Sequence, residues 1–197
     1  MSRTRSKAVR RSLRLRYNSP VVLSFALLGL AALLADSVSL GRSRELLFSV
    51  YSFSPDDPLG YIRLLTHVLG HSSWEHYSGN IMLILVIGPA LEHRYGSRNL
   101  LLCIMLTALV TGVAQCLLFP NSMLCGASGV VFMMILLASM GGTRSGGIPL
   151  TMVAVAVFYL GGELAAALSV RDNISQLSHI LGGVCGAAMG FYLESRE

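Results

Sequence analysis

Residues 125–132 read Cys125-Gly126-Ala127-Ser128-Gly129-Val130-Val131-Phe132, a serine between two glycines at the head of an apolar run. Glycine removes the side chain where a backbone turns sharply or packs closely. The pattern therefore predicts that Ser128 opens a helix with its hydroxyl unobstructed. Such a serine is either a nucleophile or an N-cap, since serine is among the preferred capping residues. The rest of the chain decides between these two roles.

The composition favours a protein built from membrane-spanning helices. Of the 197 residues, 53% are hydrophobic and 13% are charged, which is too apolar for an ordinary soluble domain. Each span has to satisfy its own backbone hydrogen bonds in lipid, which a helix does. The sequence therefore predicts an all-α membrane protein with six transmembrane helices.

The basic residues are concentrated at the start of the chain. The net charge is +5, and seven of the fifteen Lys and Arg residues lie within residues 1–17. Aromatic and basic residues do not alternate in the rest of the chain, so nucleic acid is not the expected partner. The cluster is either a cytoplasmic anchor or a disordered tail. We divide the chain into a basic cytoplasmic arm, residues 1–17, and a six-helix membrane domain, residues 18–197.

Six apolar segments are expected to cross the bilayer. The first is interpreted as a retained helix, because no small-residue signal cleavage site stands out. Residues 41–73 are expected to form a long non-spanning loop partly in the interface, and residues 92–98 and 169–176 shorter loops. The expected spans are residues 20–35, 74–91, 100–119, 127–140, 148–168 and 177–193.

Charge asymmetry supports this count and gives an orientation. With six spans and the N-terminus inside, the inner segments hold eleven of the fifteen basic residues. The outer segments hold only Arg42, Arg44, Arg63 and Arg171. Under the positive-inside rule this split favours a cytoplasmic N-terminus, and we expect a multi-pass protein of the plasma membrane.

The fourth span, residues 127–140, is unusually short. Its length of about 21 Å falls short of a hydrocarbon core of about 30 Å. The end that carries Ser128 is expected to stop inside the membrane, because the other end is tied by a Gly-rich loop. Irregular backbone at that depth is tolerated where it lines a water-filled cavity. The sequence therefore predicts a wet pocket, open to the outer side, with Ser128 at its floor.

His179 is the candidate base for this serine. It lies near the outer end of the sixth span, and Gly182, Gly186 and Gly190 follow it as a stripe that lets two helix backbones approach. A hydroxyl and an imidazole brought together make a nucleophile and a base. The alternative is a helix-end histidine bonded to a backbone carbonyl. No third group is evident, so we expect a dyad, with the Phe132 ring either stacked on the imidazole or packed in the core.

His76 and Asn80 are the candidate stabilisers of a developing oxyanion. They are four residues apart and share one helix face, and their N–H groups are suitable donors to a carbonyl oxygen that gains negative charge. With the backbone N–H of Ser128 they would form an oxyanion hole. Hydrogen bonds between helices are the structural alternative.

No cofactor or metal is expected from the remaining polar groups. His67, His71 and Glu75 recur at four-residue spacing, but the H-E-x-x-H arrangement of a zinc site is missing. Glu163 is an intramembrane acid, and a buried hydrogen bond that holds the fifth span is favoured over a reactive role. Without C-x-x-C spacing, the four cysteines are expected to be free thiols: Cys103, Cys116, Cys125 and Cys185.

These segments resemble those of the rhomboid intramembrane serine proteases. The resemblance covers about residues 61–193 and is carried by four segments in the same order along the chain. It implies a six-helix core, a dyad of Ser128 and His179, oxyanion donors at His76 and Asn80, and cleavage of transmembrane proteins near the outer membrane surface. The segments are residues 63–71, residues 76–80, Gly126-Ala127-Ser128-Gly129, and His179-Ile180-Leu181-Gly182 with Gly186.

Two departures from the family pattern stand out. Ile62 precedes Arg63 where the family often has tryptophan, and Phe132 stands where it often has tyrosine. Neither change removes a reacting group. The leading hypothesis is a protease with single-span or multi-span membrane proteins as substrates, and the alternative is a catalytically inactive relative that binds and escorts membrane helices. A transporter is less favoured, since no internal repeat is visible.

Overall fold

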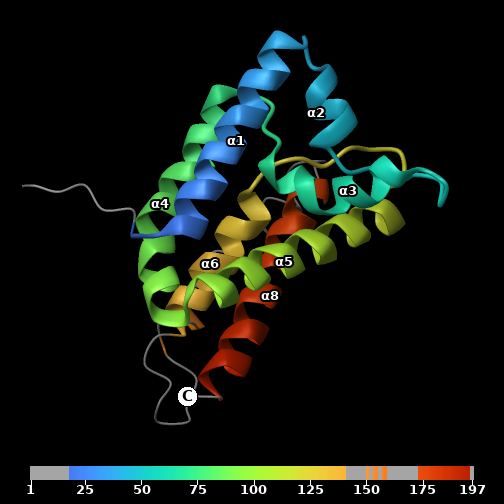
Figure 1. The fold of residues 1–197 in the computed structure, drawn as a ribbon. Helices are drawn as coiled ribbons and strands as arrows, with labels where there is room; N and C mark the ends of the chain where they lie inside the picture. Colours follow the sequence, from blue (N-terminus) through green and yellow to red (C-terminus); the bar gives the residue numbers. More distant parts are fainter. Residues whose placement is uncertain (1–17, 141–149, 151–152, 155–156, 159–172, 196–197) are drawn as a thin grey trace, which may run out of the picture.

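The computed structural model describes residues 18–140, 150, 153–154, 157–158 and 173–195, which are mostly helical (Figure 1). The all-α prediction is confirmed for this part of the chain. The basic arm 1–17 and most of the predicted fifth span, with Glu163, lie outside it. The helices are α1 (Pro20–Val38), α2 (Arg42–Leu47), α3 (Pro58–Thr66), the 3-10 turn η1 (His67–Leu69), α4 (Trp74–Tyr95), α5 (Ser97–Leu118), α6 (Ser128–Ser139) and α8 (Asn173–Glu194).

Helix α6 forms the centre of the bundle. Residues 129–137 are all buried, and the helix packs against α4, α5 and α8. A helix that is apolar on every side is stable only when other helices surround it. Its 12 residues extend over about 18 Å, so it is even shorter than the sequence predicted. Ser128 begins this helix at the end of the bundle where α4 and α8 also begin (Figure 1).

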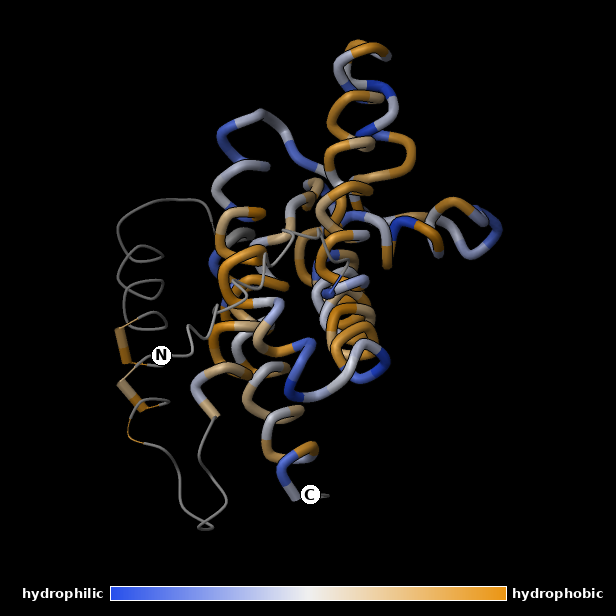
Figure 2. The backbone as a smooth tube through the Cα atoms, turned by 60° about the vertical axis from the view of Figure 1, so that its left-hand side comes forward, coloured by the Kyte–Doolittle hydropathy of each residue, from blue (hydrophilic) through white to orange (hydrophobic). Residues whose placement is uncertain are grey.

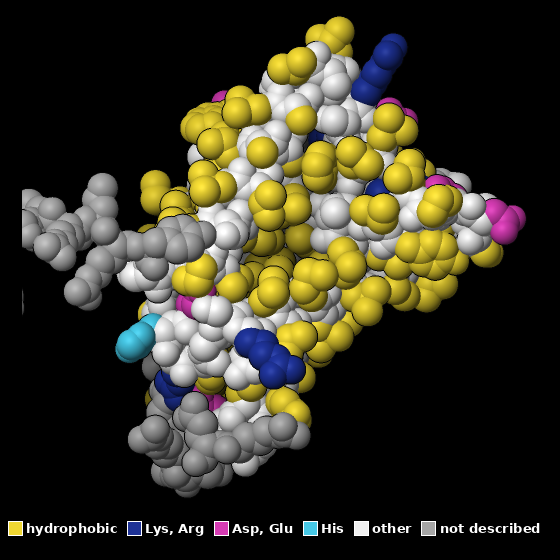
Figure 3. All heavy atoms as spheres, in the orientation of Figure 1, with side chains coloured by type: hydrophobic (Ala, Val, Ile, Leu, Met, Phe, Trp, Pro, Cys, Tyr) yellow, Lys and Arg dark blue, Asp and Glu magenta, His cyan; other side chains and the backbone are white. Residues whose placement is uncertain are grey.

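The outer surface of the bundle is apolar. Leu27, Met82, Val86 and Leu117 are each more than 60% exposed, and hydrophobic side chains cover much of the face drawn in Figure 3. Figure 2 shows hydrophobic residues along most of the helix lengths and hydrophilic residues mainly near their ends. A continuous apolar surface of this extent is suited to lipid.

Two of the described helices, α1 and α5, are long and apolar enough to cross a membrane. Helices α4 and α8 reach 22 residues each, but their sequences are more polar, and α8 follows a part of the chain that is not described. The structure thus supports an integral membrane protein. The count of six membrane spans remains a prediction.

Several helices extend beyond the predicted spans, so the polar connections are shorter than expected. Helix α1 continues to Val38, and α8 already begins at Asn173, inside the loop predicted for residues 169–176. The loop predicted for residues 92–98 is replaced by Gly96 alone, whose φ of 81° turns the chain between α4 and α5. At the junction of α4 and α5, polar residues continue the helices because their side chains bond to neighbouring helix ends.

Glu92, near the end of α4, is the clearest of these partners. Its carboxylate is buried, with 4% of the residue exposed. It accepts hydrogen bonds from the backbone N–H groups of Val21 and Val22 at 2.9 and 3.0 Å and from the Ser97 hydroxyl at 2.7 Å. The first N–H groups of a helix lack partners within it and carry partial positive charge. Glu92 therefore fixes the start of α1 to the junction of α4 and α5.

Replacing Glu92 with alanine is expected to lower the free energy of unfolding by about 3 kcal/mol, because a buried N–H, a part-buried N–H and a hydroxyl lose a charged acceptor. Unfolding of the purified protein in a mild detergent measures this change. Glu75, an exposed residue in the first turn of α4, gives the matched control Glu75→Ala. Equal stability of the two variants would contradict the role given to Glu92.

The segment 41–73, predicted only as a loop, is structured and supports the serine-bearing turn. It contains α2, α3 and η1, which the sequence pattern did not indicate. Val50 and Leu124 pair as an antiparallel bridge, with both N–H···O distances at 2.9 Å. The N–H of Gly126 donates to the carbonyl of His67 at 3.0 Å. The segment thus holds residues 124–126 just before Ser128.

Arg63 anchors α3 within this segment. Its side chain is 3% exposed, donates to the Asp57 carboxylate at 2.6 Å, and lies 4.3 Å above the centre of the Tyr51 ring. This hydrogen bond to Arg63 holds the pKa of the Asp57 carboxyl below its ordinary value. Ile62, the residue that departs from the family pattern, is 48% exposed. The anchor therefore does not depend on a buried ring before Arg63.

Candidate active site

Ser128 is the first residue of α6 and is half-buried, at the head of a helix whose next nine residues are buried. The residue in the N-cap position is Ala127, so Ser128 does not have the capping role that the sequence left open. The preceding Gly126 has a φ of 128°, a conformation that other residues rarely adopt. This glycine allows the sharp turn that leads into Ser128.

Helix α8 packs against α6 through the predicted glycine stripe. A Cβ on Gly182 would overlap the carbonyl oxygen of Gly129, and a Cβ on Gly186 would overlap that of Met133. Gly190 packs against side chains instead, with a Cβ 2.6 Å from Cγ of Met140. The two helix backbones are therefore in direct contact at Gly182 and Gly186, on two successive turns of α8.

This contact brings His179 beside the start of α6. The imidazole of His179 stacks on the Phe132 ring, with the ring centroids 4.5 Å apart and the planes 11° apart. Phe132 is four residues after Ser128 and therefore on the same face of α6. Gly182, one turn after His179, meets Gly129. The hydroxyl of Ser128 and the imidazole of His179 thus belong to adjacent turns of two helices in contact.

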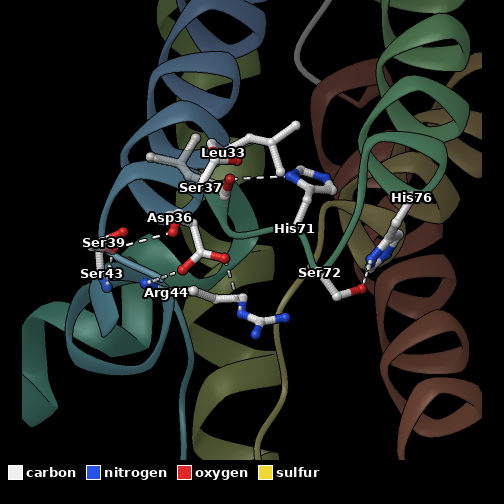
Figure 4. A network of polar contacts seen from close by, with 10 residues as sticks. Leu33, Asp36, Ser37, Ser39, Ser43, Arg44, His71, Ser72 and His76 are labelled. Carbon is white, nitrogen blue, oxygen red and sulfur yellow. Dashed lines mark hydrogen bonds and ion pairs between the residues drawn. The ribbon is translucent and has the colours of Figure 1, made fainter. Parts of the chain in front are cut away.

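His76, near the start of α4, lies against the turn that precedes Ser128. A Cβ on Gly126 would come within 2.8 Å of Cε1 and Nε2 of the His76 ring. The other ring nitrogen, Nδ1, lies 3.2 Å from the Ser72 hydroxyl, as Figure 4 shows. His76 is also within electrostatic reach of His179. Its Nε2 atom therefore faces the region between the starts of α4, α6 and α8.

Asn80 lies one turn after His76 on α4. The residue is 9% exposed, and its Nδ2 atom is buried without a hydrogen-bond partner among the described residues. A buried amide N–H without a partner is costly, and such exceptions are rare in folded proteins. An unpaired donor of this kind is available to a group that binds from outside the chain.

His67 has a partner for each ring nitrogen, whereas Nε2 of His71 is buried without a partner among the described residues. The two ring nitrogens of His67 lie 3.2 Å from the Arg63 carbonyl and 3.2 Å from the Thr111 hydroxyl. Burial lowers the pKa of each histidine to about 4, with the charge of His76 adding to the effect at His71. The ordinary pKa of histidine is about 6.5. With a pKa of about 4, both side chains are neutral at pH 7.

His71 packs between η1 and the start of α4. Its Nδ1 atom lies 3.1 Å from the Leu69 carbonyl, and its ring meets those of His76 and Tyr77 edge-on, with centroids 5.1 and 5.3 Å apart. Figure 4 shows His71 between the end of α1 and the start of α4. Within the described ranges, no three His, Cys, Asp or Glu side chains are grouped as metal ligands.

The cysteines are free, as the sequence predicted. Cys125 is the only one near the site, three residues before Ser128. Burial raises the pKa of its thiol, although the Ser49 side chain bonds to it and acts in the opposite direction. The thiolate is the nucleophilic form of cysteine. The raised pKa keeps Cys125 in the thiol form, which is the less nucleophilic one.

Sequence reasoning missed Ser72 and Thr111. Ser72 bonds to His76, and its position four residues earlier was a signal that could have identified it. Thr111 fixes His67 from a helix 44 residues away along the chain, and no local pattern indicated that pair. Both orient the histidines of this region.

One comparison with known proteins bears on this site. A family model described as the Rhomboid domain matches residues 58–196. The match covers well over half of the chain and contains α3 to α8, with every residue of the candidate site.

Proposed function

The chain belongs to the rhomboid family, and from this premise we propose that it is an intramembrane serine protease with Ser128 as nucleophile and His179 as general base. One observation carries the proposal. The half-buried Ser128 lies one helical turn from Phe132, on whose ring His179 stacks at 4.5 Å. A hydroxyl at a helix start beside an imidazole is the minimum machinery for acyl transfer.

In the proposed reaction, the Ser128 hydroxyl oxygen attacks the carbonyl carbon of the substrate peptide bond. His179 takes the hydroxyl proton and later gives it to the leaving amine as the C–N bond breaks. Water then attacks the acyl-enzyme ester, again through His179, and releases the new carboxyl end with Ser128 restored. The flat contact with Phe132 keeps the imidazole in one orientation through both steps.

The oxyanion of the tetrahedral intermediate would be stabilised by Nε2–H of His76, Nδ2–H of Asn80 and the backbone N–H of Ser128. Two observations support this. Nδ1 of His76 has the Ser72 hydroxyl 3.2 Å away as a partner, and Nε2 faces Gly126; the proposal places the ring proton on Nε2, with Ser72 donating to Nδ1. The Asn80 amide has no partner among the described residues, so it can bind the oxyanion without first breaking another hydrogen bond.

Replacing Asn80 with alanine is expected to lower kcat by about 10²- to 10³-fold with a small effect on KM, because the lost donor acts mainly on the transition state. Folding stability should change little, since the amide has no partner among the described residues. Kinetics on a model single-span substrate, with thermal unfolding in parallel, test this. Ser78→Ala, two residues away on α4, is the control; equal kcat for both variants would show that Asn80 has no catalytic role.

The proposed substrates are single-span or multi-span membrane proteins, cleaved in or near the membrane span. The short α6 supports this, because Ser128 then lies below the level reached by longer helices. The charge pattern of the sequence favours a cytoplasmic N-terminus. In that orientation the site opens toward the outer surface of the plasma membrane.

Labelling with a serine-reactive fluorophosphonate tests the proposal most directly. The purified protein in detergent should be labelled, and Ser128→Ala should not. The rival possibility is an inactive rhomboid relative that binds and escorts membrane helices. Equal labelling of the unmodified protein and Ser128→Ala would favour that rival. So would a protein that is not labelled and does not cleave any of several substrates.

A further inference from the structure

A hollow of about 440 Å³ lies on the side of the bundle, between α1 and α5 and below α3. Its deepest side chains are Phe25, Val68 and Ile104, each at most 6% exposed. Leu28 and Leu101 form the rims, at 56% and 47% exposed. Figure 3 shows this region as a depression walled by hydrophobic side chains. The volume is within the range of small-molecule sites, about 300–1,000 Å³.

The hollow is suited to a hydrocarbon chain. Only Ser24 and Ser97 contribute hydroxyls to its lining, and the Ser97 hydroxyl already donates to Glu92. Water would find few partners there, since an ordered water needs two to four polar neighbours. The two walls, α1 and α5, are the described helices suited to cross a membrane, so the opening faces the acyl chains of the bilayer.

The charge at one end of the hollow indicates which kind of lipid headgroup would bind there. Its lower end is formed by Pro20 and Ser97, and the next residue, Arg98, is exposed and makes no ion pair with any residue in the described ranges. The nearby acids are already bonded, Glu92 to the start of α1 and Glu194 to Arg94. Among the described residues, Arg98 therefore supplies the unpaired charge at this end, and it is positive.

We propose that the hollow is a binding site for one anionic glycerophospholipid, with an acyl chain between α1 and α5 and the phosphate at Arg98. The lipid belongs to the leaflet on the side of the bundle where α8 ends. This site is separate from the proposed active site, and the inference does not depend on proteolysis.

The bound acyl chain would also stabilise the serine-bearing turn, through its contact with η1. Val68 and Leu69 of η1 line the hollow. His67 in the same turn accepts the N–H of Gly126 through its carbonyl, two residues before Ser128. An acyl chain against η1 therefore packs behind the backbone that holds this turn.

Native mass spectrometry of the full chain tests the site. Delipidated protein in detergent is titrated with dioleoyl phosphatidylglycerol or with dioleoyl phosphatidylcholine. We expect one phosphatidylglycerol per chain, retained at least tenfold more tightly than phosphatidylcholine. Leu101→Trp, which fills the hollow, should weaken retention at least tenfold. Its matched control is Leu102→Trp, next on α5, 54% exposed and outside the lining, which should retain the lipid.

Arg98→Gln is the headgroup variant, and it should bring the affinities for the two lipids within about twofold of each other. Equal effects of Leu101→Trp and Leu102→Trp would overturn the acyl site, and equal retention of both lipids by the unmodified chain would overturn the headgroup assignment. Displacement of the lipid by a single-span peptide would show that the hollow binds a helix instead. If Leu101→Trp does not fold as Leu102→Trp does, Ser24→Phe, which fills the same hollow from α1, replaces it with the same expected loss.

Discussion

Ser128→Ala is expected to reduce kcat/KM for a membrane-protein substrate by about 10⁴-fold or more, the scale seen when a nucleophile is removed from a serine hydrolase. His179→Ala should cause a loss of similar size, since without a base the hydroxyl is a poor nucleophile. The double variant should be little worse than either single variant, because the two groups act as one unit. Cleavage by purified protein in detergent measures all three.

Ser139→Ala is the matched control for this series. Ser139 is a buried serine at the far end of the same helix, and its hydroxyl bonds to the Leu136 carbonyl. Its removal should leave the cleavage rate within about twofold of the parental value, in line with the small effects of substitutions away from a reacting group. Parental cleavage by Ser128→Ala or by His179→Ala would show that the dyad is assigned wrongly.

Gly182→Ala is expected to have the second largest effect. The added methyl group would overlap the carbonyl oxygen of Gly129 on α6, and backbone on both sides leaves no flexible side chain to move away. Overpacking of this kind costs about 1–3 kcal/mol. The separation of α6 and α8 would also shift His179, which lies one turn before Gly182, and a displacement of about 1 Å can cost about 10²-fold in rate.

Gly79→Ala provides the comparison. Gly79 lies on α4, and a methyl group added there would have no atom of another residue within 4 Å among the described residues. Alanine at this position should therefore be neutral or should stabilise the helix by up to about 1 kcal/mol. Unfolding in detergent and kcat are measured on both variants. If Gly182→Ala matches Gly79→Ala in both measurements, the direct backbone contact between α6 and α8 does not support the site.

The local features of the site could be read from the sequence. Glycines at 182, 186 and 190 predicted a close helix contact, and they meet α6 as expected. The ring stacking of Phe132 and His179 was one of two alternatives, and the structure contains it. These predictions succeeded because the 3.6-residue helical repeat determines which residues share a face. The catalytic roles of Ser128, His179, His76 and Asn80 remain predictions.

The sequence alone determined the all-α class, the approximate helices and the candidate nucleophile and base, because hydrophobic segments and helical spacing are local properties of the chain. The tertiary structure decided which polar groups have partners. Glu92 reaches the start of α1 from 70 residues away, and the segment 41–73 folds into helices that hold the turn before Ser128. These partners are separated in sequence and meet only through packing, so no local pattern contains them.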